Sequence, residues 1–135
     1  MGQRMVVGVS DTVLRGAAVG ELVGHEFDLV IGHGYAHTLA MIVTLNDLAG
    51  LVVQNRSWDG LDGVDLLVEA RRRRPEIGRT ILVPLIASSG GIEDAAAHAI
   101  CWTPWEPGEL ASAVRRATTV ARASMLRMPP QLGLR

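Results

Sequence analysis

Five short apolar runs alternate with stretches of helical periodicity along this chain, and that rhythm constrains the fold more than any other feature. The runs are rich in β-branched residues, as expected for strands that are buried on both faces of a sheet. The expected strands are Met5–Val9, Phe27–Ile31, Leu51–Gln54, Thr80–Ile86 and Ile100–Trp102. The expected helices are Val13–Val23, Ala36–Leu48, Leu61–Arg74, a short Ile92–Ala97 and Pro107–Met125.

A strand followed by a helix, repeated five times, predicts a parallel sheet with right-handed crossovers. The expected fold class is therefore α/β: a (βα)5, doubly wound five-stranded parallel sheet of flavodoxin-like order. No linker or internal repeat divides the chain. We expect one domain over residues 1–125, followed by a short C-terminal tail over residues 126–135.

The composition excludes several kinds of chemistry. All 13 basic residues are arginine, so no lysine is present for a Schiff base or a phosphate-binding loop. The single cysteine excludes an intramolecular disulfide and a multi-cysteine zinc site. A net charge of −1 gives no general attraction to nucleic acid or to an acidic membrane surface. We therefore expect no cofactor and no nucleic-acid or membrane partner.

Three features are missing from the sequence: a membrane-spanning segment, a signal peptide and a recognisable catalytic pair. No segment reaches the ~18 consecutive apolar residues of a membrane-spanning helix. The first ten residues lack the basic region and cleavage site of a signal peptide, so a cytoplasmic protein is expected. No nucleophile–base pair or carboxylate pair has a recognisable spacing, so we do not expect an enzyme.

In an open α/β sheet, function lies outside the carboxyl ends of the strands. The residues at those ends carry a family resemblance. The segment LVVQNRSWDGLDGVDLLVEARRRRPEI (residues 51–77) resembles the pattern of a response-regulator receiver domain: an apolar strand, the phospho-acceptor, Asp-Gly and an amphipathic helix. The segment TPWEPGELASAVRRA (residues 103–117) is similar to the Lys-Pro-Phe segment of the same two-component family and its following helix. The resemblance covers about residues 5–123.

The resemblance implies a phosphorylation pocket that has lost most of its chemistry. The family's magnesium-binding acidic pair falls on Ser10 and Asp11. The phospho-accepting Asp falls on Asn55, or on Gln54 if the register shifts by one residue. A carboxamide cannot form an acyl phosphate. The degenerate pocket comprises Ser10, Asp11, Asn55, Ile86 or Ala87 at the family's Thr or Ser, and Thr103 at its Lys.

With only Asp11 keeping the family's residue type, we expect weak or absent magnesium binding. The resemblance then implies an atypical, phosphorylation-independent receiver that signals through protein–protein contacts. The family's usual partner surface combines the fourth helix, the fifth strand and the fifth helix, and the fourth helix is expected to be shortened here. We expect a protein partner or a homodimer on this face, through Ile100, Trp102, Trp105, Arg115 and Arg116.

Two alternatives remain at this point. The first is a small-molecule module in which Trp58 and Ser88, with the neutral pocket residues, hold a ligand by stacking and hydrogen bonds. The second is a response regulator that is phosphorylated at a non-standard residue. Two further motifs favour structural roles: Arg71–Arg74 lies at the C-terminal end of a helix, and His33 with His37 lacks a third metal ligand.

Overall fold

The computed structural model describes residues 3–25, 27–55, 63–84 and 96–126. Its single sheet has five parallel strands in the order β2-β1-β3-β4-β5, which confirms the expected doubly wound α/β fold. The strands are β1 (Gln3–Gly8), β2 (Phe27–Ile31), β3 (Leu48–Gln54), β4 (Gly78–Pro84) and β5 (Ala99–Thr103). The helices are α1 (Thr12–Val23), α2 (Tyr35–Thr44), α3 (Gly63–Arg73) and α4 (Glu109–Leu126).

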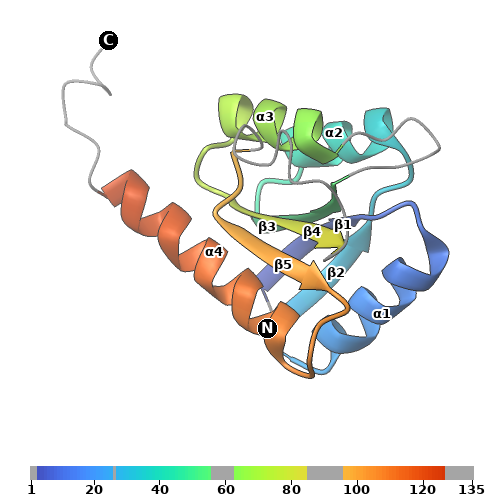
Figure 1. Ribbon diagram of the computed structural model, residues 1–135. Coiled ribbons are helices and arrows are strands. Elements are labelled where there is room, and N and C mark those ends of the chain that lie inside the picture. Colours follow the sequence, from blue (N-terminus) through green and yellow to red (C-terminus); the bar gives the residue numbers. More distant parts are fainter. Residues whose placement is uncertain (1–2, 26, 56–62, 85–95, 127–135) are drawn as a thin grey trace, which may run out of the picture.

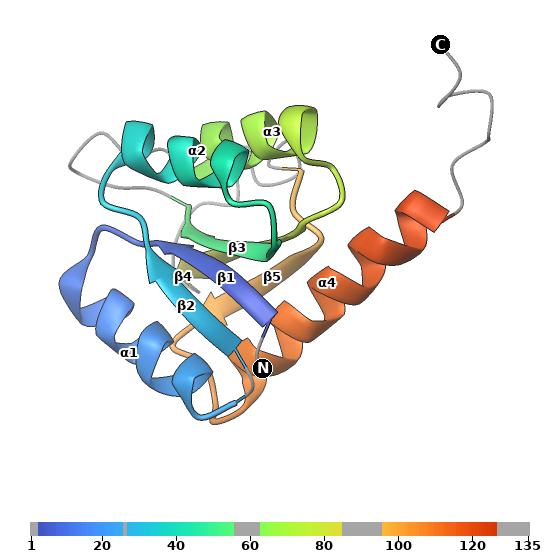
Figure 2. The ribbon, with the colours of Figure 1, turned by 180° about the vertical axis from the view of Figure 1, so that it is seen from behind.

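The helices cover the sheet in two layers (Figures 1 and 2). One core, between the sheet and α1 with α4, contains Val7, Val52 and Leu82. The other, between the sheet and α2 with α3, contains the neighbouring residues Val6 and Val53. Successive strand residues thus enter opposite cores, which explains why the strands are apolar throughout rather than alternating.

Several element boundaries differ from those expected. The helix expected over Ala36–Leu48 ends at Thr44, and Leu48 instead begins β3. Leu48 pairs with Arg4 of β1, so a contact distant in sequence overrides the local apolar pattern. The fourth strand begins at Gly78 rather than Thr80, and the last helix begins two residues after Pro107.

The short helix expected over Ile92–Ala97 lies mostly outside the described residues. The two that are described, Ala96 and Ala97, are not helical. Ala96 has a φ of 61°, the left-handed region that alanine rarely adopts. Its carbonyl accepts a 2.6 Å hydrogen bond from the side chain of Arg79, a buried arginine near the start of β4. This contact helps to hold the chain in that conformation as it enters β5.

Among the described residues, no helix is long and apolar enough to cross a membrane. The tail expected over residues 126–135 begins within α4, which continues to Leu126. Residues 127–135 lie outside the described part of the chain.

Candidate functional site

The residues expected to form the pocket come from the carboxyl ends of three described strands. Ser10 and Asp11 follow β1, Asn55 follows β3, and Thr103 is the last residue of β5. All four are half-buried. The remaining pocket and ligand-contact residues, Trp58, Ile86, Ala87 and Ser88, lie outside the described residues.

The side chain of Gln54 occupies the space beside the loop that follows β1. Its Oε1 accepts hydrogen bonds from the backbone N–H of Ser10 at 2.8 Å and of Asp11 at 2.9 Å. The Ser10 hydroxyl also donates to this oxygen at 3.3 Å. Gln54 is only 6% exposed, so a buried amide oxygen holds the β1–α1 loop against the end of β3. Reasoning from the sequence considered Gln54 only as a poor nucleophile and missed this role.

Asp11 is the N-cap of α1. One carboxylate oxygen accepts the backbone N–H of Leu14 at 3.0 Å, which satisfies a donor that the first turn leaves open. Because Asp11 precedes the helix, its negative charge also interacts favourably with the helix dipole.

Asp11 is the one carboxylate among the described residues of the expected pocket. Mg²⁺ is usually bound by one or two carboxylates together with phosphate oxygens and water. Here Asp11 supplies one carboxylate, already used as a cap, and the Gln54 oxygen is used by the β1–α1 loop. The described residues contain no group of three or more His, Cys, Asp or Glu side chains that could hold a metal ion.

Helix α3 begins in direct contact with the end of β3. A Cβ added to its first residue, Gly63, would overlap the backbone carbonyl of Gln54. The close approach therefore requires glycine, which gives a physical reason for the glycine that opens the amphipathic helix noted in the sequence. The backbone N–H of Asn55, directly after β3, donates to the carbonyl of Leu82 in β4 at 2.9 Å, so pairing with β4 continues to this edge.

Comparisons with known proteins place the fold. No protein-family model matches the chain, and curated proteins gave no significant match. A CheY-like response regulator receiver domain protein from Methanospirillum hungatei JF-1 matches with a TM-score of 0.78 and 18% identity, covering 92% of this chain and 99% of that one. A response regulator receiver domain protein from Clostridium thermocellum matches with a TM-score of 0.74 and 15% identity, covering 93% and 99%.

NtrX from Brucella abortus matches with a TM-score of 0.81 and 16% identity, covering 93% of this chain and 29% of that longer chain. The chain has the receiver-domain fold. At these identities the likeness establishes the fold alone.

Within this receiver fold, Glu21 of α1 binds the start of α4. Its carboxylate accepts backbone N–H groups from Gly108 at 3.2 Å, Leu110 at 2.9 Å and Ala111 at 3.1 Å. Burial alone would raise the pKa of Glu21, but these bonds and one from the Trp105 side chain outweigh it, so the pKa is lowered. Glu21 thus caps a helix that lies nearly ninety residues away in the sequence.

The Glu21 contact predicts a specific pH dependence. Because the pKa is lowered by folding, the stabilisation is complete above the ordinary value of 4.5 and is lost as pH falls through the folded-state pKa. At neutral pH, Glu21→Gln is expected to lower the free energy of unfolding by about 1–2 kcal/mol, the size of a helix-cap contact. Urea unfolding of both proteins at neutral pH and at about pH 3 should show the difference shrinking in acid. An undiminished difference at low pH would contradict the role of the charge.

The residues expected at the partner surface fall into two groups. Ile100 and Trp102 are 37% and 41% exposed, and both project from edge strand β5 on the side of the sheet that carries α2 and α3. Trp105 instead packs half-buried against the core shared by α1 and α4. Arg115 lies 5.8 Å above the ring of Phe27. Ile100, Trp102, Arg115 and Arg116 are exposed, whereas Trp105 is half-buried; Arg115 also contacts His25 within the chain.

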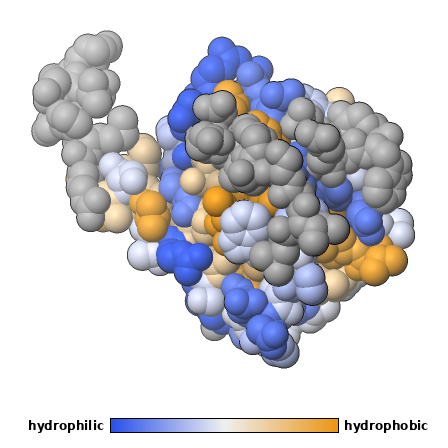
Figure 3. Space-filling model, in the orientation of Figure 1, coloured by the Kyte–Doolittle hydropathy of each residue, from blue (hydrophilic) through white to orange (hydrophobic). Residues whose placement is uncertain are grey.

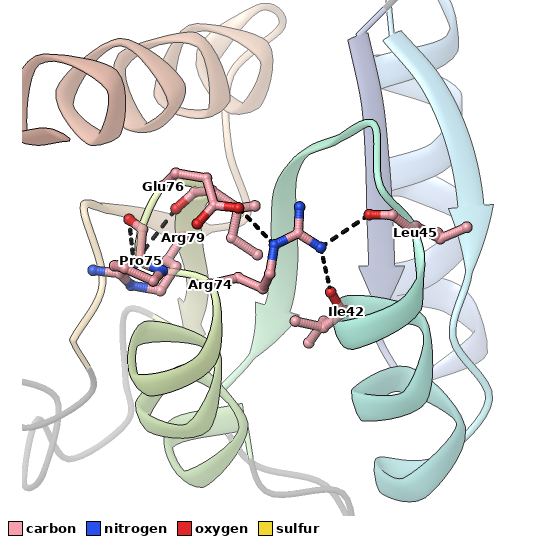
Figure 4. Close-up of polar contacts among 7 residues, drawn as sticks. Ile42, Leu45, Arg74, Pro75, Glu76 and Arg79 are labelled. Carbon is pink, nitrogen blue, oxygen red and sulfur yellow. Dashed lines mark hydrogen bonds and ion pairs between the residues drawn. The ribbon is translucent and has the colours of Figure 1, made fainter. Parts of the chain in front are cut away.

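The arginine run Arg71–Arg74 is also used within the chain. Arg74 donates from Nη1 to the carbonyls of Ile42 at 2.8 Å and Leu45 at 2.9 Å, and so caps the C-terminal end of α2 (Figure 4). The two arginines before it both pair with Glu69 at 3.1 Å. Arg74 therefore joins α3 to α2, and Arg72 and Arg73 share one carboxylate of their own helix.

The two exposed histidines after β2 form a local contact. The rings of His33 and His37 stack with centroids 5.7 Å apart, and the backbone N–H of His33 donates to His37 Nδ1 at 2.9 Å. This bond orders the turn into α2 and occupies one of the two nitrogen atoms that His37 could offer to a metal.

Proposed function

We propose that this chain is a receiver-type signalling module that works through protein–protein contacts and is not phosphorylated. The observation that carries the proposal is the position of Gln54. Its amide oxygen takes the two backbone N–H groups of the β1–α1 loop at the end of the sheet where receiver domains carry out their chemistry. The support from known structures is the fold, which this chain shares with response-regulator receiver domains.

The chemistry of the neighbouring residues supports the same proposal. Phosphoryl transfer to a protein carboxylate needs a nucleophilic Asp and positive charge to stabilise the phosphoryl oxygens. At the corresponding positions this chain has the neutral side chains of Asn55 and Thr103. Asp11 supplies negative charge and no cation, and its carboxylate is engaged as a helix cap.

The exposed residues of β5 support recognition of another protein. Large apolar side chains exposed together mark interaction sites, and tryptophan and arginine are frequent anchors in protein interfaces. Ile100 and Trp102 are such side chains, and Arg116 of α4 is exposed on the helix that follows β5. We propose that these three residues contact the signalling partner.

The test is phosphorylation by a small-molecule donor. The purified chain incubated with acetyl phosphate and Mg²⁺ should gain no phosphoryl group by intact-mass spectrometry, because Asn55 and Thr103 stand where the family has its carboxylate nucleophile and its cation. The matched variant Ser10→Asp, Asn55→Asp, Thr103→Lys restores the three family residue types and is expected to gain a hydroxylamine-labile adduct. A phosphorylatable receiver domain serves as the control for the donor. A Mg²⁺-dependent, hydroxylamine-labile adduct on the unmodified chain would overturn the proposal.

A further inference from the structure

The outer face of α1 exposes apolar residues without any charge. Val13 is 81% exposed and Val23 is 62% exposed, more than any other large hydrophobic residue of the described chain except Leu126 at the end of α4. The exposed residues between them are Gly16, Ala17 and Gly20. Positions 13, 16, 17, 20 and 23 follow helical spacing and therefore lie on one side of the helix. Hydrophobic surface is visible at the right-hand edge of Figure 3, where Figure 1 shows the start of α1.

No contact within the described part of the chain requires glycine at position 16 or at position 20. Glycine inside a helix costs about 1 kcal/mol relative to alanine. A Cβ built on Gly16 or on Gly20 would meet no atom within 4 Å, so the folded chain itself leaves room for a side chain at both positions. A helix that approaches from outside would use this room, because glycine lets two helix backbones come close together.

We propose that the partner on this face is a second copy of the chain, with the two α1 helices packed antiparallel. A two-fold axis that crosses the exposed face midway between Gly16 and Gly20 brings Gly16 of one copy opposite Gly20 of the other. The same axis brings Val13 opposite Val23, so the large side chains flank the closest approach at both ends. The face is thus complementary to itself, as a two-fold dimer interface requires.

The charges at the two ends of α1 favour the antiparallel arrangement. Asp11 is negative and caps the start of the helix. At the other end, Arg115 contacts His25, with Arg115 Nη2 2.7 Å from His25 Nδ1. In an antiparallel pair each Asp11 approaches the Arg115 end of the other copy, and the two helix dipoles oppose each other favourably. A parallel pair would place like charges together at both ends.

The expected dimer is weak and concentration-dependent. Helix α1 has 12 residues and is therefore about 18 Å long, so a contact between two such helices stays below the ~1,000 Å² of a stable interface. This interface leaves Ile100 and Trp102 of β5 free. The proposal therefore stands apart from the proposed function, and a negative result here leaves the phosphorylation test unaffected.

Sedimentation equilibrium from micromolar to millimolar concentration tests the association. We expect the unmodified chain to move from monomer to dimer and Gly20→Leu to weaken the association at least tenfold, because the new side chain holds the helices apart. The control Ala40→Leu makes the same kind of change on the exposed face of α2 and should leave the association unchanged. Gly20→Leu meets open space in the monomer, so urea unfolding should show no loss of stability. A chain that stays monomeric throughout, or equal association of Gly20→Leu, would overturn the proposal.

Cross-linking tests the antiparallel register. In a Cys101→Ala background, Val13→Cys and Val23→Cys are made as two separate proteins. A short bifunctional maleimide should join them when they are mixed and should join neither protein to itself. Cross-linking of Val13→Cys to itself would indicate a parallel pair and contradict the proposed arrangement.

Discussion

Replacing Gly63 by alanine is expected to lower the free energy of unfolding by about 3 kcal/mol or more, a large part of the total stability of a small domain. The new Cβ would overlap the backbone carbonyl of Gln54, and neither the strand nor the helix can yield without moving as a unit. The start of α3 must therefore separate from the end of β3. Urea unfolding at neutral pH measures the effect.

The matched control for this prediction is Gly16→Ala. It is the same change on an exposed helix, where the new Cβ meets no atom within 4 Å. It should raise stability by about 1 kcal/mol, as alanine does relative to glycine inside a helix. If the two variants changed stability by similar amounts, the tight contact between Gly63 and the Gln54 carbonyl would be refuted.

Replacing Gln54 by leucine is expected to lower the free energy of unfolding by about 2–4 kcal/mol. The change removes the acceptor of the Ser10 and Asp11 backbone N–H groups, and each donor left unpaired away from water costs about 1–3 kcal/mol. Leucine has a similar volume and keeps the apolar contacts of the site, so the loss reports mainly on the hydrogen bonds. The amide signals of residues 10 and 11 in a ¹⁵N–¹H NMR spectrum should shift as well.

The variant Gln54→Glu distinguishes loss of the acceptor from a change in shape. A carboxylate keeps an oxygen at the same place and accepts charge-assisted hydrogen bonds from the same N–H groups. The nearby Asp11 carboxylate opposes the added charge, so the net loss should be smaller than that of Gln54→Leu. Equal losses for the two variants would show that Gln54 does not stabilise the loop through its Oε1 acceptor.

The strand order and the two helical layers follow from the sequence because each strand is apolar throughout and each crossover has a fixed hand. The boundary between α2 and β3 does not. Leu48 satisfies both the helical spacing before it and the apolar run after it, and the decision comes from its pairing with Arg4, more than forty residues away. Local pattern cannot supply a contact of that kind.

The side-chain contacts of the site were likewise not predictable where they join residues distant in the sequence. Alternation along β3 places Gln54 on the same side as Val52, facing α1, so its direction was available from the sequence. Its bonds to the β1–α1 loop were not, because they depend on how closely β1 and β3 pack. The contact of Glu21 with α4 was harder still to predict, since an isolated acidic residue within α1 gives no indication of the α4 backbone amides that it binds.

Helix α4 is bound by Glu21 of α1 at its first turn, and its last turn extends past the sheet (Figure 1). Its 18 residues make it about 27 Å long, so a rotation of about 10° at its first turn would displace its far end by roughly 5 Å. Glu21 fixes the position of the first turn. At the other end Ala121 is the last fully buried residue, and the chain beyond it extends past the sheet (Figure 1). Because α4 is buried against the sheet as far as Ala121, such a rotation would have to carry the whole helix over the strands beneath it.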